Sequence, residues 1–186
     1  MIWYLLKCPE GNEANYVERC RGLSNIKGIQ DIICFQYQRM LRYSGSWHLE
    51  NRLLLPGCIF LSKFTGEKAN KTIREENVDT EESKKNRKKE AADFRKNIKV
   101  SEGLISAIIP CKVSDLKSLC SEDNLIKMSQ GIIKNGVPVV THGPLKGRED
   151  LIRKIDRHKR TAEIEIQLAG QTERITVGLE IYKKQI

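Results

Sequence analysis

Residues 137–147 read Val-Pro-Val-Val-Thr-His-Gly-Pro-Leu-Lys-Gly, and the fold of the second half of the chain depends on this stretch. Its first half is rich in β-branched residues, which favour an extended, half-buried strand. Gly143-Pro144 then predicts a tight turn, because glycine allows unusual φ angles and proline fixes the next φ near −65°. Gly147 allows the backbone to fold back, and a basic stretch follows it.

Two further segments carry the signature of strands. Apolar and polar residues alternate over 162–168 and again over 175–181, and Gly170 separates the two segments. A period of two is typical of strands with one buried face. Several short strands within about 55 residues predict a small, nearly closed β-barrel, because closure removes exposed sheet edges.

The charge of the chain is positive and concentrated. The 186 residues carry a formal net charge of +9, and residues 141–160 hold seven Lys and Arg against three Asp and Glu. A basic cluster of this kind predicts an acidic partner, with nucleic acid the first candidate. The candidate RNA contacts are the basic residues that follow the turn: Lys146, Arg148, Arg153, Lys154, Arg157, His158, Lys159 and Arg160.

The six cysteines do not have the spacing of a metal site. No Cys-x-x-Cys pair occurs and no histidine stands at ligand spacing, so a structural zinc site is disfavoured. Reduced thiols fit a cytoplasmic protein. The first residues lack the cationic start of a signal peptide, and no apolar run approaches the roughly 18 residues of a membrane span. We expect a cytoplasmic protein without a cofactor.

The first half of the chain predicts alternating elements. Residues 2–8 predict a strand, and Asn12 can cap the following helix, with Ala14 and Val17 facing inward. Residues 32–43 and 53–61 predict two more strands. Arg39, Arg42 and Tyr43 lie near the tip of the hairpin between them, where either a solvated tip or a nucleic-acid contact is possible.

Residues 65–100 form a charge-dense insertion. Acids come first and bases follow, an order that favours a solvated helix over about 79–96; a nucleic-acid surface is the alternative. Residues 103–109 then predict a short strand and Ser114 begins a short helix to about Cys120. The expected division is a first domain over 1–122, a linker over 123–130 and the barrel over 131–186.

Taken together, these segments resemble NusG-type transcription factors. The resemblance rests on Trp3-Tyr4-Leu5-Leu6, on Leu55-Pro56-Gly57-Cys58-Ile59-Phe60-Leu61 and on the Gly-Pro-Leu-Lys-Gly turn of a KOW motif. Residues 143–162 are most similar to the LoaP branch of specialised antiterminators. The resemblance implies an α+β fold, in which an N-terminal antiparallel sheet flanked by helices (an NGN-like domain) precedes a five-stranded SH3-like KOW β-barrel.

The resemblance also implies a function. A member of this family is not an enzyme; it acts as a monomer, docks on bacterial RNA polymerase, and in the LoaP branch contacts a structured hairpin of the nascent RNA. The family's docking surface maps onto Tyr4, Lys7, Cys58 and Phe60. A core role for Tyr4 and Phe60 is the alternative.

The chain departs from general NusG proteins at two places. Leu145 stands where they carry Phe, and Ala169-Gly170-Gln171 stands where they carry Phe-Gly-Arg. These departures count against coupling to the ribosome or to the termination factor Rho, and so against a general elongation factor, which is the alternative function. An enzyme is disfavoured, since no nucleophile stands beside His142 or His158 at a defensible spacing. The sequence leaves open whether the barrel can refold into helices.

Overall fold

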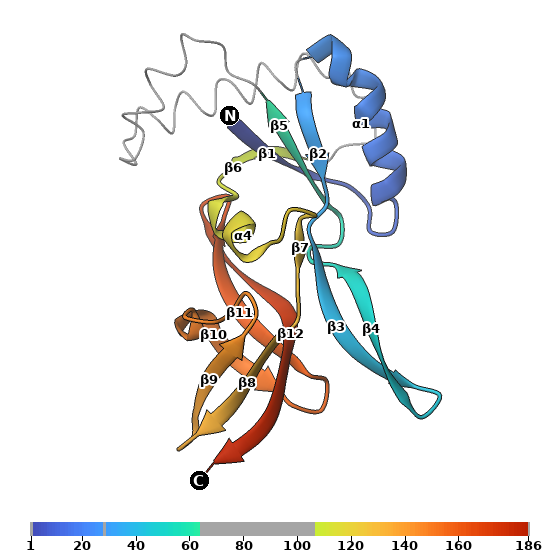
Figure 1. Ribbon diagram of the computed structural model, residues 1–186. Coiled ribbons are helices and arrows are strands. Elements are labelled where there is room, and N and C mark those ends of the chain that lie inside the picture. The colour runs from blue at the N-terminus through green and yellow to red at the C-terminus, as the bar shows by residue number, and fades with distance from the viewer. Residues whose placement is uncertain (1, 28, 64–106, 186) are drawn as a thin grey trace. The chain divides into compact units, whose positions relative to one another are not determined.

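The computed structural model describes residues 2–27, 29–63 and 107–185, which fall into two compact units (Figure 1). The first unit comprises residues 1–33 and 56–112, and the second comprises residues 34–55 and 113–186. Among the described residues, no helix has the length and apolar character needed to cross a membrane.

The described strands of the first unit form an antiparallel sheet in the order β2-β5-β1-β6. Its elements are β1 (Ile2–Lys7), α1 (Glu13–Lys27), β2 (Ile29–Ile33), β5 (Cys58–Lys63) and β6 (Ala107–Cys111). The central strands β1 and β5 are buried on both faces, as their nearly continuous apolar sequences require. This sheet is the core of the first unit.

Helix α1 begins directly after Asn12, and its first residue fastens it to the turn before β5. The buried Glu13 carboxylate accepts a hydrogen bond from the Gly57 backbone N–H at 2.7 Å. Gly57 has a φ of 71°, and a Cβ there would lie 2.7 Å from the Cys8 carbonyl oxygen. The inward-facing positions differ from those expected: Ala14 is exposed and Val17 half-buried, while Tyr16 is buried.

The second unit holds two sheets. One has the order β4-β3-β7 and the other the order β10-β11-β12-β8-β9. The first is built from β3 (Gln36–Tyr43), β4 (Ser46–Leu53) and β7 (Leu125–Ile126). The second is built from β8 (Ser129–Lys134), β9 (Val137–His142), β10 (Ile152–Asp156), β11 (Thr161–Leu168) and β12 (Gln171–Gln185). In sequence, helix α4 (Ser114–Leu119) precedes β7, and a single 3-10 turn (Glu149–Leu151) precedes β10.

Strand β12 organises the five-stranded sheet, and Figure 1 shows it as the long curved red strand. Its first half pairs with β11 in antiparallel register, from Gln171 opposite Leu168 to Gly178 opposite Thr161. Its second half pairs with β8 in parallel register, starting with Leu179 opposite Ser129. The alternating residues of β11 and β12 bury one face, which supplies most of the apolar interior of this sheet.

The Gly143–Gly147 turn packs tightly against the start of β8. Gly143 has a φ of 94°, and a Cβ there would lie 2.7 Å from the Ser129 Cα. The Lys146 N–H closes the turn by donating to the Gly143 carbonyl at 3.1 Å. Leu145 is fully buried, and its N–H donates to the Ser129 hydroxyl at 3.2 Å. The turn therefore adds a side chain to the apolar interior of the second unit.

The β3–β4 hairpin is fixed to other parts of the second unit at three levels. At its base, β3 pairs with β7, and the Gln36 N–H donates to the Asn124 carbonyl at 3.1 Å. Midway, a Cβ at the buried Gly178 would lie 2.3 Å from the Gln38 carbonyl oxygen, so β12 and β3 approach closely only because position 178 is glycine. Near the tip, the Arg160 guanidinium lies 3.7 Å from the centre of the Trp47 ring.

The expected α+β fold class is wrong. The described residues are mostly strands in three sheets, and their α-helices are α1 and α4. Of these, only α1 belongs to the unit of the first sheet, so that sheet is not flanked by helices within the described residues. The physical reason is that residues 36–53 do not join the first sheet. They form a separate sheet with β7, a strand that lies in the expected linker.

The structure does not decide two other expectations, the helix in the insertion and the division into domains. The helix expected over 79–96 lies outside the described residues. The expected division into 1–122, 123–130 and 131–186 stays a prediction, although Leu125 and Ile126 within the expected linker are buried in β7. The β3–β4 hairpin belongs to the same compact unit as residues 113–186.

Candidate nucleic-acid interface

The basic residues expected to bind RNA do not converge on one surface. Arg148 donates to the Ser118 hydroxyl at 2.7 Å, and Arg153 pairs with Glu165 at 2.7 Å. Lys146 is exposed in the Gly143–Gly147 turn. Arg148 and Arg153 line one depression together with Glu165, whereas Lys146 lies in the turn outside it.

A second group lies beside Tyr37 and Arg39 of the hairpin. Lys154 pairs with Glu163 at 3.7 Å and Lys159 pairs with Asp156 at 3.7 Å, so both charges have acidic neighbours. Such exposed pairs contribute little to stability, but they lower the local positive potential. This group is therefore the weaker candidate for phosphate binding.

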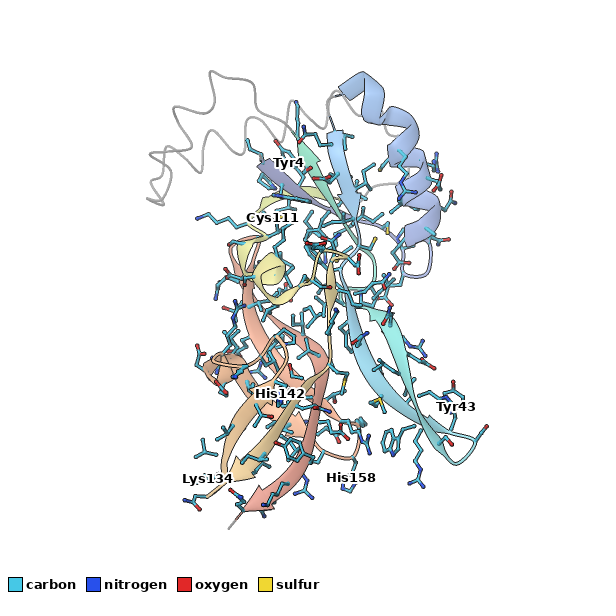
Figure 2. The ribbon with its side chains drawn as sticks, in the orientation of Figure 1. Tyr4, Tyr43, Cys111, Lys134, His142 and His158 are labelled. Atoms are coloured by element: carbon cyan, nitrogen blue, oxygen red, sulfur yellow. The ribbon has the colours of Figure 1, made fainter. Side chains whose placement is uncertain are left out.

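The third group forms what we call the basic cleft. Arg157, His158 and Arg160 of the β10–β11 turn line it together with residues that come from β3, β4 and the end of β12. Those additional residues are Arg42, Trp47, Glu180, Ile181, Tyr182, Lys183 and Lys184. The volume of the cleft is about 710 Å³. Figure 2 labels His158 at this turn.

Asp156 shapes the turn that carries Arg157 and His158. Its carboxylate accepts a hydrogen bond from the Lys159 backbone N–H at 2.9 Å. This hydrogen bond is the main reason that the pKa of Asp156 is lowered from its ordinary value, so the carboxylate stays ionised and the turn stays closed. Arg157 and His158 lie inside the closed turn with exposed side chains.

The electrostatics of the basic cleft favour an anion. Its lining includes five Lys and Arg side chains and one carboxylate, Glu180. Arg160 pairs with Glu180 at 2.8 Å, and the Trp47 ring holds the same guanidinium. The other four cations, Arg42, Arg157, Lys183 and Lys184, are exposed and have no ion-pair partner within the described parts of the chain. They are therefore available to a polyanion.

Arg160 has a different role from the one expected of it. Its side chain is 24% exposed and is held between Glu180 and Trp47, and its φ is 51°. A guanidinium fixed on both sides connects the five-stranded sheet to the hairpin, whereas the exposed Arg157 beside it is free to meet a ligand. Within the predicted set, Arg157 and His158 are the two residues that the basic cleft presents openly.

Sequence reasoning missed the contribution of the C-terminal strand. Tyr182, Lys183 and Lys184 end the last alternating segment, and an aromatic residue followed by two lysines was the available signal. Trp47 was also missed, since its position over Arg160 depends on contacts between distant segments. Arg42, near the hairpin tip where a nucleic-acid contact is one of the two interpretations, lines the basic cleft.

The residues expected to meet polymerase lie on two faces of the first sheet. Leu5 is opposite Phe60 and Lys7 is opposite Cys58, so Lys7, Cys58 and Phe60 share one face, while Tyr4 points to the other. The Lys7 ammonium donates to the Cys58 thiol at 3.1 Å. Tyr4, Cys58 and Phe60 are all buried, which favours the core interpretation of Tyr4 and Phe60. Only Lys7 of the four is exposed.

The cysteines are free thiols, and within the described residues no group of three or more His, Cys, Asp or Glu side chains could hold a metal ion. Burial raises the pKa of Cys111 to about 12 and that of Cys120 to about 11, so both are neutral at physiological pH.

No protein-family model matches the chain, and no curated protein sequence matches it.

Proposed function

We propose that this chain is a specialised transcription elongation and antitermination factor, which binds bacterial RNA polymerase and holds a structured element of the nascent RNA through its second unit. The proposal combines the sequence resemblance to NusG-type factors with the charge distribution of the second unit. The proposed action is binding, with no chemical step.

The observation that carries the proposal is the set of four unpaired cations in the basic cleft. Arg42, Arg157, Lys183 and Lys184 come from the hairpin, the β10–β11 turn and β12, yet they line one depression. Like charges gathered on a surface repel one another and contribute nothing to folding. A phosphate backbone gains from them, because each neutralised phosphate releases a condensed counterion.

The proposed mechanism is a shift in the populations of polymerase states. A factor that binds the elongating state more tightly than the paused or terminating state favours elongation by that difference in affinity. RNA held in the basic cleft would keep the factor near the transcript from which it was recruited. Of the four residues expected to dock on polymerase, only Lys7 is exposed, so Lys7 is the one proposed to contact polymerase.

The test removes the cleft cations that have no structural partner. Replacing Arg157, Lys183 and Lys184 with alanine should leave the melting temperature unchanged and weaken binding to an RNA stem-loop at least tenfold. The slope of log affinity against log salt concentration should fall by roughly two, since each phosphate contact contributes about 0.7–0.9. The measurement is fluorescence anisotropy of a labelled stem-loop at several salt concentrations.

A matched control keeps the loss of charge the same. Arg52, Lys112 and Lys127 are exposed and lie outside the basic cleft, so their replacement with alanine should leave RNA affinity nearly unchanged. Equal affinity of the cleft variant and the wild-type protein for RNA would contradict the proposal. Equal losses in both variants would show attraction by net charge alone, which would also contradict a defined interface.

A further inference from the structure

Two aromatic side chains stand among the cations of the basic cleft. Trp47 comes from β4 and Tyr182 from β12, and both line the depression that holds Arg157, Lys183 and Lys184. Tyr182 is 57% exposed, which is unusual for a large ring that has no ligand. Cations that alternate with aromatic faces are characteristic of surfaces that bind single-stranded nucleic acid.

The Trp47 ring is held in place. The guanidinium of Arg160 lies 3.7 Å from the ring centre, and Glu180 holds that guanidinium at 2.8 Å. On the strand beside it, Arg42 is the direct cross-strand neighbour of Trp47, so a free cation stands next to the ring on the same face of the hairpin. A ring fixed in this way loses little conformational freedom when a base stacks on it.

Tyr182 is in contact with another strand of its own sheet, β9. Its hydroxyl lies 3.4 Å from the Thr141 hydroxyl of β9, at hydrogen-bonding distance. The contact holds the phenol at the end of β12, where Lys183 and Lys184 follow in sequence. Each aromatic residue of the cleft therefore has an anchor at one side and a free cation nearby.

From this arrangement we infer that the basic cleft binds unpaired nucleotides of an RNA loop, with bases stacked on Trp47 and Tyr182 and phosphates on the free cations. The inference rests on the proposed function, because it names which part of an RNA the site takes. Bases in a duplex are already stacked on one another, whereas bases in a loop can turn outward onto an aromatic side chain. The volume of about 710 Å³ suits a few nucleotides.

The hairpin is therefore part of the RNA site. Strand β3 is packed against β12 at Gly178 and pairs with β7 at its base. The hairpin that carries Trp47 therefore belongs to the same compact unit as the five-stranded sheet. Arg160 and Glu180 are positioning residues, since they hold the ring and have no free charge to offer. The β12 end and the β10–β11 turn supply the opposite wall of the cleft.

The test compares two RNA probes with the full-length protein. One is a stem-loop with an eight-nucleotide unpaired loop, and the other has the same loop length and phosphate number with abasic loop positions. The wild-type protein should bind the first probe roughly tenfold more tightly or better, because stacking on aromatic residues is lost with the bases. Trp47→Leu and Tyr182→Leu should each reduce this preference while the salt dependence stays unchanged.

Tyr43 provides the matched control. It is 50% exposed and stacks on His48, with ring centres 3.7 Å apart, on the face of the hairpin opposite Trp47. Figure 2 labels it at the hairpin tip. Tyr43→Leu should keep the full preference for the loop bases. If Trp47→Leu displaces the hairpin and lowers the melting temperature, Tyr182→Leu still tests the inference, because that residue is outside the hairpin.

The outcomes separate the two levels of the proposal. No binding to either probe would overturn the proposed function and this inference with it. Tight binding of both probes with equal affinity would overturn the inference alone, as would unchanged preference in both aromatic variants. Stronger binding of an acidic peptide or of the same loop in DNA would assign the basic cleft to another partner and overturn the inference. Quenching of tryptophan fluorescence by the stem-loop, lost in Trp47→Leu, would support it.

Discussion

Gly143 and Gly147 belong to the same turn but have different surroundings. Both have positive φ angles, of 94° and 74°, which L-residues adopt only with strain. A Cβ at Gly143 would lie within 3 Å of backbone and side-chain atoms of Ser129 and of the Met128 carbonyl oxygen. At Gly147, no atom lies within 4 Å of such a Cβ. The first glycine is therefore required by its conformation and by packing, and the second by its conformation alone.

The two glycines give a paired prediction. Gly143→Ala should lower the free energy of unfolding by about 3 kcal/mol or more, because strain adds to a clash that only a backbone shift can relieve. Gly147→Ala should cost about 1 kcal/mol. Urea unfolding followed by circular dichroism measures both. Similar losses in the two variants would show that the packing of Gly143 against Ser129 does not contribute.

At the scale of an element, helix α1 depends on the acid at its first position. Burial raises the pKa of Glu13, but hydrogen bonds from backbone N–H groups, that of Gly57 first among them, lower it by more. The pKa therefore ends below the ordinary value of a carboxyl group. A carboxylate at the N-terminus of a helix also interacts favourably with the helix dipole. The contact connects the start of α1 to the turn before β5.

Glu13→Gln should lower the free energy of unfolding by about 1–2 kcal/mol at pH 7. A lowered pKa means that the ionised carboxylate stabilises the fold above its unfolded pKa near 4.3, and that this stability is lost as the pH falls through the lower folded value. The difference between wild type and variant should therefore shrink between pH 5 and pH 3. A constant difference across this range in denaturant unfolding would show that the ionised form is not what matters.

Strands β11 and β12 were predictable because each has one buried face over part of its length. The alternation over 162–168 and 175–181 matches β11 and β12, and Gly143-Pro144 marked the turn correctly. Helix α1 was predicted at its start but not on its buried side, because the polar Glu13 is buried for its hydrogen bond to Gly57, a residue far along the chain. The local sequence shows whether a segment alternates like a strand or a helix, but it does not show which distant residues will pack against that segment.

The candidate site was only partly predictable for the same reason. The exposed Arg157 and His158 follow from a basic turn between two strands. Whether another cation is paired or free depends on which acids lie opposite it. Glu163, for example, lies opposite Lys154 in the register of β10 and β11. The hairpin joins the cleft through Gly178, where a Cβ would lie 2.3 Å from the Gln38 carbonyl oxygen. No period or spacing in the sequence specifies that contact.

At the scale of the whole molecule, the burial of Phe60 in the first sheet counts against a direct contact between this residue and polymerase. Phe60 is fully buried and lies opposite Leu5 in the core of the sheet. Phe60→Ala should therefore lower the free energy of unfolding by about 3–5 kcal/mol, with any loss of polymerase binding following from unfolding. Thermal unfolding and a polymerase pull-down measure the two effects.

Lys7→Ala is the informative companion. The Lys7 side chain is exposed and donates a hydrogen bond to the Cys58 thiol, a weak acceptor, so its loss should change the melting temperature little. Weaker polymerase binding by a folded Lys7 variant would support docking at this face of the sheet. Unchanged binding by that variant, together with full binding by a Phe60 variant that stays folded, would remove the whole expected set from the docking surface.

The grouping of the β3–β4 hairpin with residues 113–186 has a consequence for the order in which the protein is synthesised. The hairpin leaves the ribosome about 120 residues before β12, a delay of roughly 6–24 s at 5–20 residues per second. During that interval Gln38 cannot yet contact Gly178, and Trp47 cannot yet contact Arg160. The hairpin must therefore avoid binding other chains until these residues are synthesised. Its net positive charge and its tight Ser44-Gly45 turn, both with positive φ angles, suit a segment that emerges early and docks last.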